Sequence, residues 1–363
     1  MAMTFRPILE RTEKRPILIA GPCSAETEEQ VLQTARELAS DGRIDLFRAG
    51  IWKPRTRPGE FEGVGAPGLA WLKKVKEETG LKVTTEVGNR EHVFEALKAG
   101  IDVLWIGART TVNPFTVQEI ADALRGVDIP VMVKNPVNPD LKLWMGGIER
   151  LYKAGITRLA AIHRGFSFHG ETSYRNVPHW QIPIDLRRNF PDIQIICDNS
   201  HICGRRDTLQ EVAQKAMDLN FDGIMTEVHP TPDQAWSDAA QQITPAQYNA
   251  MIESMTFPEA NSTDPIFAQH MNDLRHEIDE IDENLLNLLG RRMKIAEKIG
   301  EYKKENNIAV LQTSRWNEIL SKAVKHGAKK GLSEEFVTVV LKAIHDESIN
   351  HQIRIMHGEE AVK

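Results

Sequence analysis

Four side chains of the kinds that bind metal ions stand at or beyond the ends of short apolar runs. They are Cys23, His201, Glu227 and Asp238. A thiolate, an imidazole and two carboxylates that converge can hold one divalent cation, and this mixture of ligands suits Mn, Fe, Co or Zn better than Mg or Ca. A lone cysteine is usually just a small buried apolar residue, which is how Cys197 and Cys203 are interpreted. The prediction of a metal site therefore depends on the four groups together.

Basic side chains form a second set at similar places in the sequence. The set comprises Arg48, Lys53, Arg55, Arg109, Lys134 and Arg164. Any one of them is more often a solvated surface charge, but the chain carries a formal net charge of −6 and cations recur after consecutive apolar runs. Arginine offers phosphate and carboxylate groups a two-pronged fork, and lysine offers a point charge. The set therefore predicts an anionic substrate.

Eight short runs rich in Ile and Val must position these groups. We expect strands at residues 17–21, 46–50, 83–86, 103–107, 130–134, 158–162, 193–197 and 223–227, each followed by a helical segment. An open doubly wound sheet would gather its ligands at one switch point. Here a charged or metal-binding residue follows every run, as at the active-site face of a closed barrel. The predicted fold is therefore an α/β (β/α)8 (TIM) barrel.

The strand pattern stops near Phe257 and gives way to helices. We expect a barrel over residues 1–257, a linker over 258–265 and an all-α domain over 266–363. In the last part, apolar residues recur at steps of three and four, which predicts helices near residues 265–304, 313–326 and 333–357. The leader before the first strand has room for a β-hairpin but not for a separate regulatory domain.

Several motifs of the first part occur in a characteristic order. They are GPCS at 21–24, KPRT at 53–56, GAR at 107–109, HRG at 163–165, Cys-Asp-x-Ser-His at 197–201, and Glu227 with Asp238. In these motifs, residues 6–256 resemble the 3-deoxy-D-arabino-heptulosonate 7-phosphate (DAHP) synthases. That family condenses phosphoenolpyruvate with erythrose 4-phosphate, the first step of the shikimate pathway of aromatic amino acid biosynthesis.

The resemblance implies a role for each candidate residue of the barrel. Cys23, His201, Glu227 and Asp238 would hold the metal, with Mn2+ as the first expectation and Co2+, Fe2+ or Zn2+ as alternatives. Arg48, Lys53, Arg109, Lys134 and Arg164 would bind phosphoenolpyruvate, and Arg55 with Thr56 would reach the aldose phosphate. Lys53, Lys134, His201 and Glu86 would serve in catalysis, Glu86 by positioning the water that adds at C2.

The last part resembles the all-helical chorismate mutases. The resemblance rests on the first helix from Leu274 to Leu286, then Arg291-Arg292-Met293, Gly300-Glu301-Tyr302-Lys303, Arg315, and Ser348 with Gln352. It implies that Arg275 and Arg292 bind the two carboxylates of chorismate and that Lys303 and Gln352 bind the ether oxygen. Arg315 and Ser348 would assist, with Arg292, Lys303 and Gln352 as the catalytic groups.

Two positions depart from the mutase pattern and leave alternatives open. Trp316 stands where the family often has an acidic residue, and Gln312 stands where an aspartate is common. The helical domain is therefore either a chorismate mutase or a module that only senses chorismate or prephenate, or only dimerises. We expect a homodimer joined through this domain, with Arg275 completing the partner's site, and feedback inhibition of the barrel by its ligand.

Composition excludes several other classes of protein. Hydrophobic residues make up 41% and charged residues 26%, values of an ordinary globular protein. No apolar run is long enough to span a bilayer, and no signal peptide is evident, so we expect a cytoplasmic protein with no membrane partner. Its three cysteines should be reduced. The negative net charge argues against nucleic-acid binding.

Overall fold

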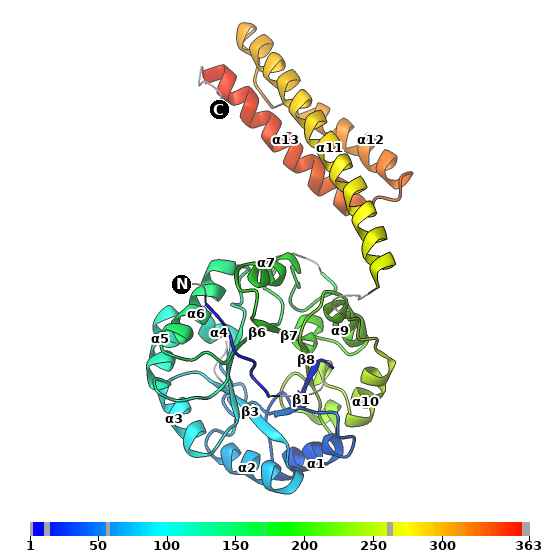
Figure 1. Cartoon of the computed structure of the whole chain (residues 1–363). Coiled ribbons are helices and arrows are strands. Elements are labelled where there is room, and N and C mark those ends of the chain that lie inside the picture. Colours follow the sequence, from blue (N-terminus) through cyan, green and yellow to red (C-terminus); the bar gives the residue numbers. More distant parts are fainter. Residues whose placement is uncertain are drawn as a thin grey trace. The chain divides into compact units, whose positions relative to one another are not determined.

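A computed structural model describes residues 3–10, 15–55, 59–170, 172–259, 264–311 and 313–357 (Figure 1). The chain divides into two compact units, Met1–Ala260 and Asn261–Lys363. The predicted limits 1–257 and 266–363 remain predictions, and linker residues 260–263 lie outside the described part of the chain.

The first unit is a closed barrel of parallel strands (Figure 1). Its strands are β1 (Ile17–Gly21), β2 (Leu46–Arg48), β3 (Lys82–Val87), β4 (Val103–Ile106), β5 (Val131–Lys134), β6 (Leu159–His163), β7 (Gln194–Asp198) and β8 (Gly223–Glu227). Each strand pairs with the next, and β1 pairs with β8 from Ile17↔Gly223 to Gly21↔Glu227. The predicted (β/α)8 barrel is confirmed.

Helices surround the barrel (Figure 1). They are α1 (Glu28–Ala39), α2 (Pro67–Thr79), α3 (Arg90–Lys98), α4 (Ala108–Thr111), α5 (Pro114–Ala123), α6 (Leu141–Lys153), α7 (Gln181–Asn189), α8 (Asn199–Cys203), α9 (Leu209–Asp218) and α10 (Pro245–Ser254). Two 3-10 turns, η1 (Pro232–Gln234) and η2 (Ala239–Gln241), lie between β8 and α10. Polar caps fix the starts of several helices. For example, the Thr27 side chain accepts a hydrogen bond from Gln30 N at the start of α1.

Side chains along each strand alternate between the barrel interior and the helix layer. The interior core consists of Ile17, Ile19, Leu46, Val103, Trp105, Met132, Ala160, Ile162, Ile196 and Met225, with Ile8 and Leu9 from the leader. The next inward positions toward the carboxyl ends are occupied by Arg48, Glu86, Lys134, Asp198 and Glu227. The alternation that fills the core therefore directs these charged groups into one mouth of the barrel.

The leader closes the other end of the barrel. Ile8 is fully buried, and its backbone N–H donates to Gln194 Oε1 at 2.9 Å. Arg158 donates to the Ile8 carbonyl at 3.0 Å. Among the described residues 3–10, the leader contributes a single β-bridge, from Arg6 to Arg158. Burial of this segment leaves the carboxyl-end mouth as the face where ligands can enter.

The described residues of the second unit form three helices, α11 (Pro265–Glu305), α12 (Thr313–Ala328) and α13 (Glu334–His357). Asp264 accepts from Ile266 N at the start of α11, and Ser333 accepts from Phe336 N at the start of α13. A Cβ at Gly300 would lie 3.1 Å from Gln352 Cα, so glycine allows α11 and α13 to approach closely. The helices expected at 265–304, 313–326 and 333–357 are thus present within two residues at each limit. Among the described residues, no helix combines the length and the apolar character that a bilayer span requires.

His163 is a buried titratable group behind the barrel mouth. It ends β6 on the side facing the helices and lies among aromatic rings, with centroids 5.3 Å from Trp180 and 5.7 Å from Phe166. Burial lowers the pKa of His163 to about 3, and the neighbouring Arg164 charge contributes. The imidazole is therefore neutral in the folded protein at every pH near neutrality.

We predict that His163 makes the barrel sensitive to acid. Below about pH 6.5, His163 is protonated in the unfolded chain but remains neutral in the folded protein. The free energy of unfolding therefore decreases as the pH falls from about 6.5 toward 3. The His163→Phe variant should reduce the loss between pH 7 and 4.5 by on the order of 2 kcal/mol, measured from denaturant midpoints of the barrel transition. His169→Phe, at an exposed histidine, is the control and should leave the loss unchanged. Equal acid sensitivity of all three proteins would refute the assignment.

Candidate active sites of the barrel and of the helical unit

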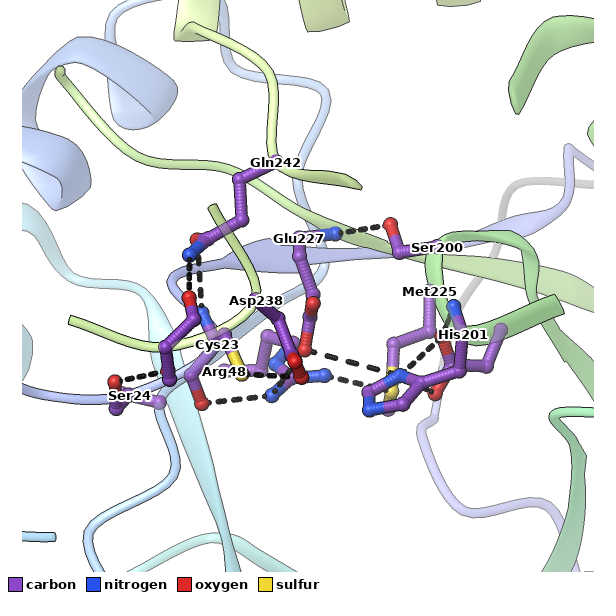
Figure 2. A network of polar contacts seen from close by, with 12 residues as sticks. Cys23, Ser24, Arg48, Ser200, His201, Met225, Glu227, Asp238 and Gln242 are labelled. Carbon is purple, nitrogen blue, oxygen red and sulfur yellow. Dashed lines mark hydrogen bonds and ion pairs between the residues drawn. The ribbon is translucent and has the colours of Figure 1, made fainter. Parts of the chain in front are cut away.

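Three of the four predicted metal ligands converge at the barrel mouth (Figure 2). Ligand atoms of Cys23, Glu227 and Asp238 all lie within 4.8 Å of one another. Cys23 Sγ is 3.4 Å from Asp238 Oδ2. Cys23 follows β1, Glu227 ends β8 and Asp238 precedes η2, so β1–β8 pairing brings the first two together and the loop after β8 returns the third.

His201 lies beside this cluster on α8. Its Nδ1 is 2.9 Å from Asp198 Oδ2 and 3.7 Å from Glu227 Oε1. Asp198 also caps α8 by accepting from His201 N at 3.2 Å. A histidine that donates its Nδ1–H to a carboxylate keeps the lone pair on Nε2, the tautomer found in metal-binding histidines. His201 therefore lies next to the cluster, although its ligand atoms are not within the 4.8 Å group.

The chemistry of the cluster fits a divalent cation. Glu227 is fully buried, and its Oε1 has no hydrogen-bond partner, although the Arg48 guanidinium lies 3.2 Å away. Burial raises the pKa of the Cys23 thiol to about 12, and the Glu227 charge adds to this. A metal ion would satisfy the unbonded carboxylate oxygen and stabilise the thiolate, because metal ligation requires the deprotonated sulfur.

The predicted substrate cations surround the cluster. Arg48 is 1% exposed, donates to the Cys23 carbonyl at 3.1 Å and lies over the Trp105 ring at 5.0 Å. Lys134 Nζ is 2.8 Å from Asp198 Oδ2. Lys53 Nζ lies 3.0 Å from Cys23 Sγ, which connects the basic set directly to the metal cluster.

Arg164, which follows β6, is also buried at the mouth. It donates to Asn176 Oδ1 at 2.6 Å. Burial lowers the pKa of Arg164 to about 10, so it remains a cation at neutral pH. Because the Asn176 amide is neutral, its hydrogen bond with Arg164 leaves the positive charge available to an anionic substrate.

The remaining barrel candidates differ in how they are placed. Arg109 lies on α4 directly after β4 and is exposed. Arg55 donates to the Phe61 carbonyl at 2.8 Å, and Thr56 lies outside the described residues. Glu86 Oε2 accepts from the Trp105 indole at 2.9 Å. A Cβ at Gly107 would come within 2.1 Å of Glu86 Oε1, which explains the glycine of the GAR motif.

Glu86 and Lys53 share a pocket of about 290 Å³. Trp52 and His92 also line it, and their rings stack at 3.9 Å with an interplanar angle of 5°. The pocket lies between residues 52–54 and the loop after β3, and Glu86 forms part of its wall.

Sequence reasoning missed three residues that organise the mouth. Asp198 joins Lys134 to His201, and strand alternation could have identified it, because it stands two positions beyond the inward-facing Ile196. Arg175 pairs with Asp238 at 2.9 Å. Asn176 joins Arg164 to the His201 carbonyl, to which its Nδ2 donates at 2.6 Å. Arg175 and Asn176 lie in an irregular loop that gives no periodic signal.

The helical unit brings four predicted mutase residues into two pairs. Arg292 on α11 donates to Ser348 Oγ on α13. Lys303 donates to Gln352 Oε1 at 3.1 Å and to the Val310 carbonyl at 2.6 Å. Ser348 and Gln352 are 5% and 8% exposed, so the α11–α13 interface carries a line of polar groups rather than a wholly apolar seam.

The other mutase candidates lie apart from these pairs. Arg315 forms an ion pair with Glu318 at 2.7 Å on the exposed side of α12. Trp316 stacks on His345 at 4.1 Å, and Gln312 lies outside the described residues. Arg275 is exposed on α11, seventeen residues before Arg292, a separation of about 25 Å along a continuous helix. Arg275 and Arg292 of the same chain are therefore too far apart to bind one small molecule together.

Comparisons with known proteins match both units. Residues 3–258 match the family model described as the DAHP synthetase I family, and residues 274–353 match the one described as chorismate mutase type II. A phospho-2-dehydro-3-deoxyheptonate aldolase of Thermotoga maritima is 29% identical over 238 residues, covering 66% of this chain and 68% of the relative. A 2-dehydro-3-deoxyphosphooctonate aldolase of Wolinella succinogenes is 28% identical over 264 residues, covering 66% of this chain and 97% of the relative.

Solved structures agree with the match to the DAHP synthases. The crystal structure of the Thermotoga maritima DAHP synthase matches with a TM-score of 0.60 and 28% identity, covering 66% of this chain and 67% of that one. A truncated form from the same organism matches with a TM-score of 0.58 and 27% identity, covering 66% and 85%. The two resemblances predicted from the motifs are confirmed.

Proposed function

The chain belongs to the DAHP synthetase I family, and from this premise we propose that its barrel joins phosphoenolpyruvate to erythrose 4-phosphate with the help of a divalent metal ion. The chain also carries a chorismate mutase domain, which supports a second enzymatic activity. The observation that carries the barrel proposal is the convergence of Cys23, Glu227 and Asp238 beside the buried cations Arg48, Lys134 and Arg164.

Different residues at the mouth have different roles in the condensation. A divalent ion held by Cys23, His201, Glu227 and Asp238 would supply a Lewis acid for the aldehyde oxygen. Lys134 and Arg164 bind the phosphate and carboxylate of phosphoenolpyruvate, and the charge that develops as phosphate leaves remains next to these fixed cations. Glu86, held by the Trp105 indole, positions the water that adds at C2.

The length of the aldose is part of the proposal. A heptonate product contains four carbons beyond the three of phosphoenolpyruvate, and an octonate product contains five. Relatives of both kinds match this chain. The KPRT sequence at 53–56 favours the four-carbon aldose phosphate through the motif resemblance, with Arg55 and Thr56 as the phosphate contacts.

We predict that removal of metal by a chelator abolishes condensation and that added Mn2+ restores it. Cys23→Ala should bind Mn2+ at least about tenfold more weakly and remain folded, because it removes one ligand without emptying the core. Cys203→Ala, at a cysteine 2% exposed on α8, is the matched control and should bind Mn2+ as the unmodified protein does. Product formation is assayed with four- and five-carbon aldose phosphates.

Two results would contradict this proposal. Full activity in thorough chelator would exclude the metal role. A higher kcat/KM for the five-carbon than for the four-carbon aldose phosphate would exclude erythrose 4-phosphate as the preferred acceptor.

For the helical unit we propose rearrangement of chorismate to prephenate. This pericyclic reaction needs no nucleophile, only a site that holds a folded dicarboxylate and stabilises charge on the breaking ether bond. Arg292 would bind a carboxylate with Ser348 assisting, and Lys303 with Gln352 would face the ether oxygen. The alternative is a domain that only senses the ligand. Chorismate turnover by the full chain distinguishes the two.

We also propose that α11 pairs with α11 of a second chain. The face of α11 that carries Ala296 and Gly300 packs on α13, and its apolar stripe continues toward the N-terminus without cover from this unit. The uncovered residues of the stripe are Leu274, Ile278, Ile281, Leu285 and Leu288, each between 52% and 64% exposed. Stripes of this size mark interaction surfaces. A second chain would cover it and could bring its own Arg275 to the Arg292 site.

The predicted homodimer can be tested by light scattering at micromolar concentration. Ile281→Glu with Leu285→Glu should give a monomer, because charges replace the centre of the stripe. Asn287→Glu lies on the other side of α11 at 3.6 residues per turn and should remain dimeric. A monodisperse monomer of the unmodified chain would refute the proposal.

Finally, we propose that prephenate or chorismate bound to the helical unit inhibits the barrel. A ligand shifts a conformational equilibrium only by its differential affinity for two states, and a preference of about 1.4 to 2.7 kcal/mol gives a ten- to hundredfold shift. The ligand and the barrel substrates need not share a site for this effect.

The prediction is that Arg292→Ala abolishes inhibition by prephenate and leaves condensation itself intact. The neighbouring Arg291→Ala is the control and should remain inhibited. Inhibition curves of condensation against prephenate give the measurement. If the curve of Arg292→Ala coincided with that of the unmodified chain, the effector would act on the barrel directly.

A further inference from the structure

Two consecutive glutamines lie beside the metal cluster and have no part in the functions above. Gln241 and Gln242 are 1% and 0% exposed. Their backbone is fixed against the end of β8, because Ile243 N donates to the Glu227 carbonyl at 3.2 Å and His229 N donates to the Ile243 carbonyl at 2.9 Å. The two carboxamides are therefore held at set positions next to β8.

Gln241 connects the two carboxylates of the cluster. Its Nε2 donates to Glu227 Oε2 at 2.6 Å. Its Oε1 accepts from Arg175 Nη1 at 2.6 Å, and the same nitrogen is 2.9 Å from Asp238 Oδ1. Gln241 thus occupies one oxygen of Glu227 and leaves the other, Oε1, without a hydrogen bond and within the cluster.

Gln242 connects the backbones that carry the other two ligands (Figure 2). Its Oε1 accepts from Cys23 N at 3.0 Å, and its Nε2 donates to the Ser237 carbonyl at 2.8 Å. Ser237 immediately precedes Asp238, whose φ of 50° is a left-handed conformation that needs support from its surroundings. One carboxamide therefore sets the spacing between the loop of Cys23 and the loop of Asp238.

We propose that Gln241 and Gln242 are positioning residues of the metal centre: Gln241 orients the Glu227 carboxylate, and Gln242 fixes Cys23 relative to Asp238. The inference rests on the proposed metal-dependent function. A carboxamide is required at both positions, because each glutamine uses its donor and its acceptor at once. Groups that orient metal ligands typically contribute ten- to a hundredfold in metal affinity.

The competing explanation is that both glutamines only satisfy polar groups in a buried loop. In that case their replacement would lower stability and leave metal affinity unchanged. The barrel offers a matched control in Gln194, whose Oε1 accepts from Ile8 N at the opposite end of the barrel. Gln194→Met removes a comparable hydrogen bond far from the metal cluster.

The test compares Gln241→Met, Gln242→Met and Gln194→Met in the full chain. The Kd of Mn2+ is measured from the free-ion signal in electron paramagnetic resonance, and the melting temperature is measured without metal. We expect about ten- to a hundredfold weaker Mn2+ binding for the first two variants and an unchanged Kd for the third. If Gln241→Met fails to fold, Gln241→Asn retains the carboxamide one methylene shorter and should show the same loss of affinity.

Co2+ spectra separate the roles of the two glutamines. Gln242→Met should weaken or shift the thiolate-to-Co2+ charge-transfer absorption, since Gln242 acts on Cys23, whereas Gln241→Met should retain this band with a larger Kd. Unchanged Mn2+ affinity and Co2+ spectra in both variants would overturn the inference. Failure of the unmodified chain to bind either ion would instead contradict the metal-dependent function itself.

Discussion

The buried ion pair of Arg48 and Glu227 is the constraint on which the barrel mouth depends. Both side chains are no more than 1% exposed, and they lie 3.2 Å apart. Taking two charges out of water costs several kcal/mol per ion even after relaxation, so each must be compensated locally. Arg48 meets most of this requirement through Glu227, the Cys23 carbonyl and the face of Trp105, although its Nε has no hydrogen-bond partner. The compensation of Glu227 is only partial, because its Oε1 accepts no hydrogen bond. This oxygen is suited to binding a metal ion.

The same requirement explains why two buried cations of the mouth each lie next to a buried carboxylate. Lys134 is buried because Asp198 is buried beside it, and Asp198 in turn holds His201. Arg48 on β2 and Lys134 on β5 each pair with a carboxylate across one intervening strand, Glu227 on β8 and Asp198 on β7, and closure of the β-sheet sets the distances between them. A substrate phosphate enters a region where the positive groups are already fixed in place, so little reorganisation is needed on binding.

Strand alternation made much of this predictable from the sequence. Arg48, Lys134 and Glu227 were predicted because they stand at the ends of the expected strands, and alternation explains why they face the mouth. Long helical periodicity likewise predicted α11 within a residue at each end. Arg175, Asn176, Gln241 and Gln242 were not predictable, because irregular loops place them and only tertiary pairing reveals their partners. Asp198 also stands at the end of a strand, but His201, three residues later, was predicted as the functional residue of that strand.

The choice of amides next to charged ligands has a physical reason. A hydrogen bond to one oxygen of a carboxylate fixes the orientation of the other oxygen, which can then bind a metal ion. Gln241 donates a hydrogen bond to Glu227 without adding a charge, and Asn176 accepts one from Arg164 without neutralising it. Neutral amides therefore help to fix the geometry of both the anionic and the cationic halves of the mouth without changing the net charge of the site. The acidic or basic replacement of such an amide would alter the electrostatics of the site even where its shape was preserved.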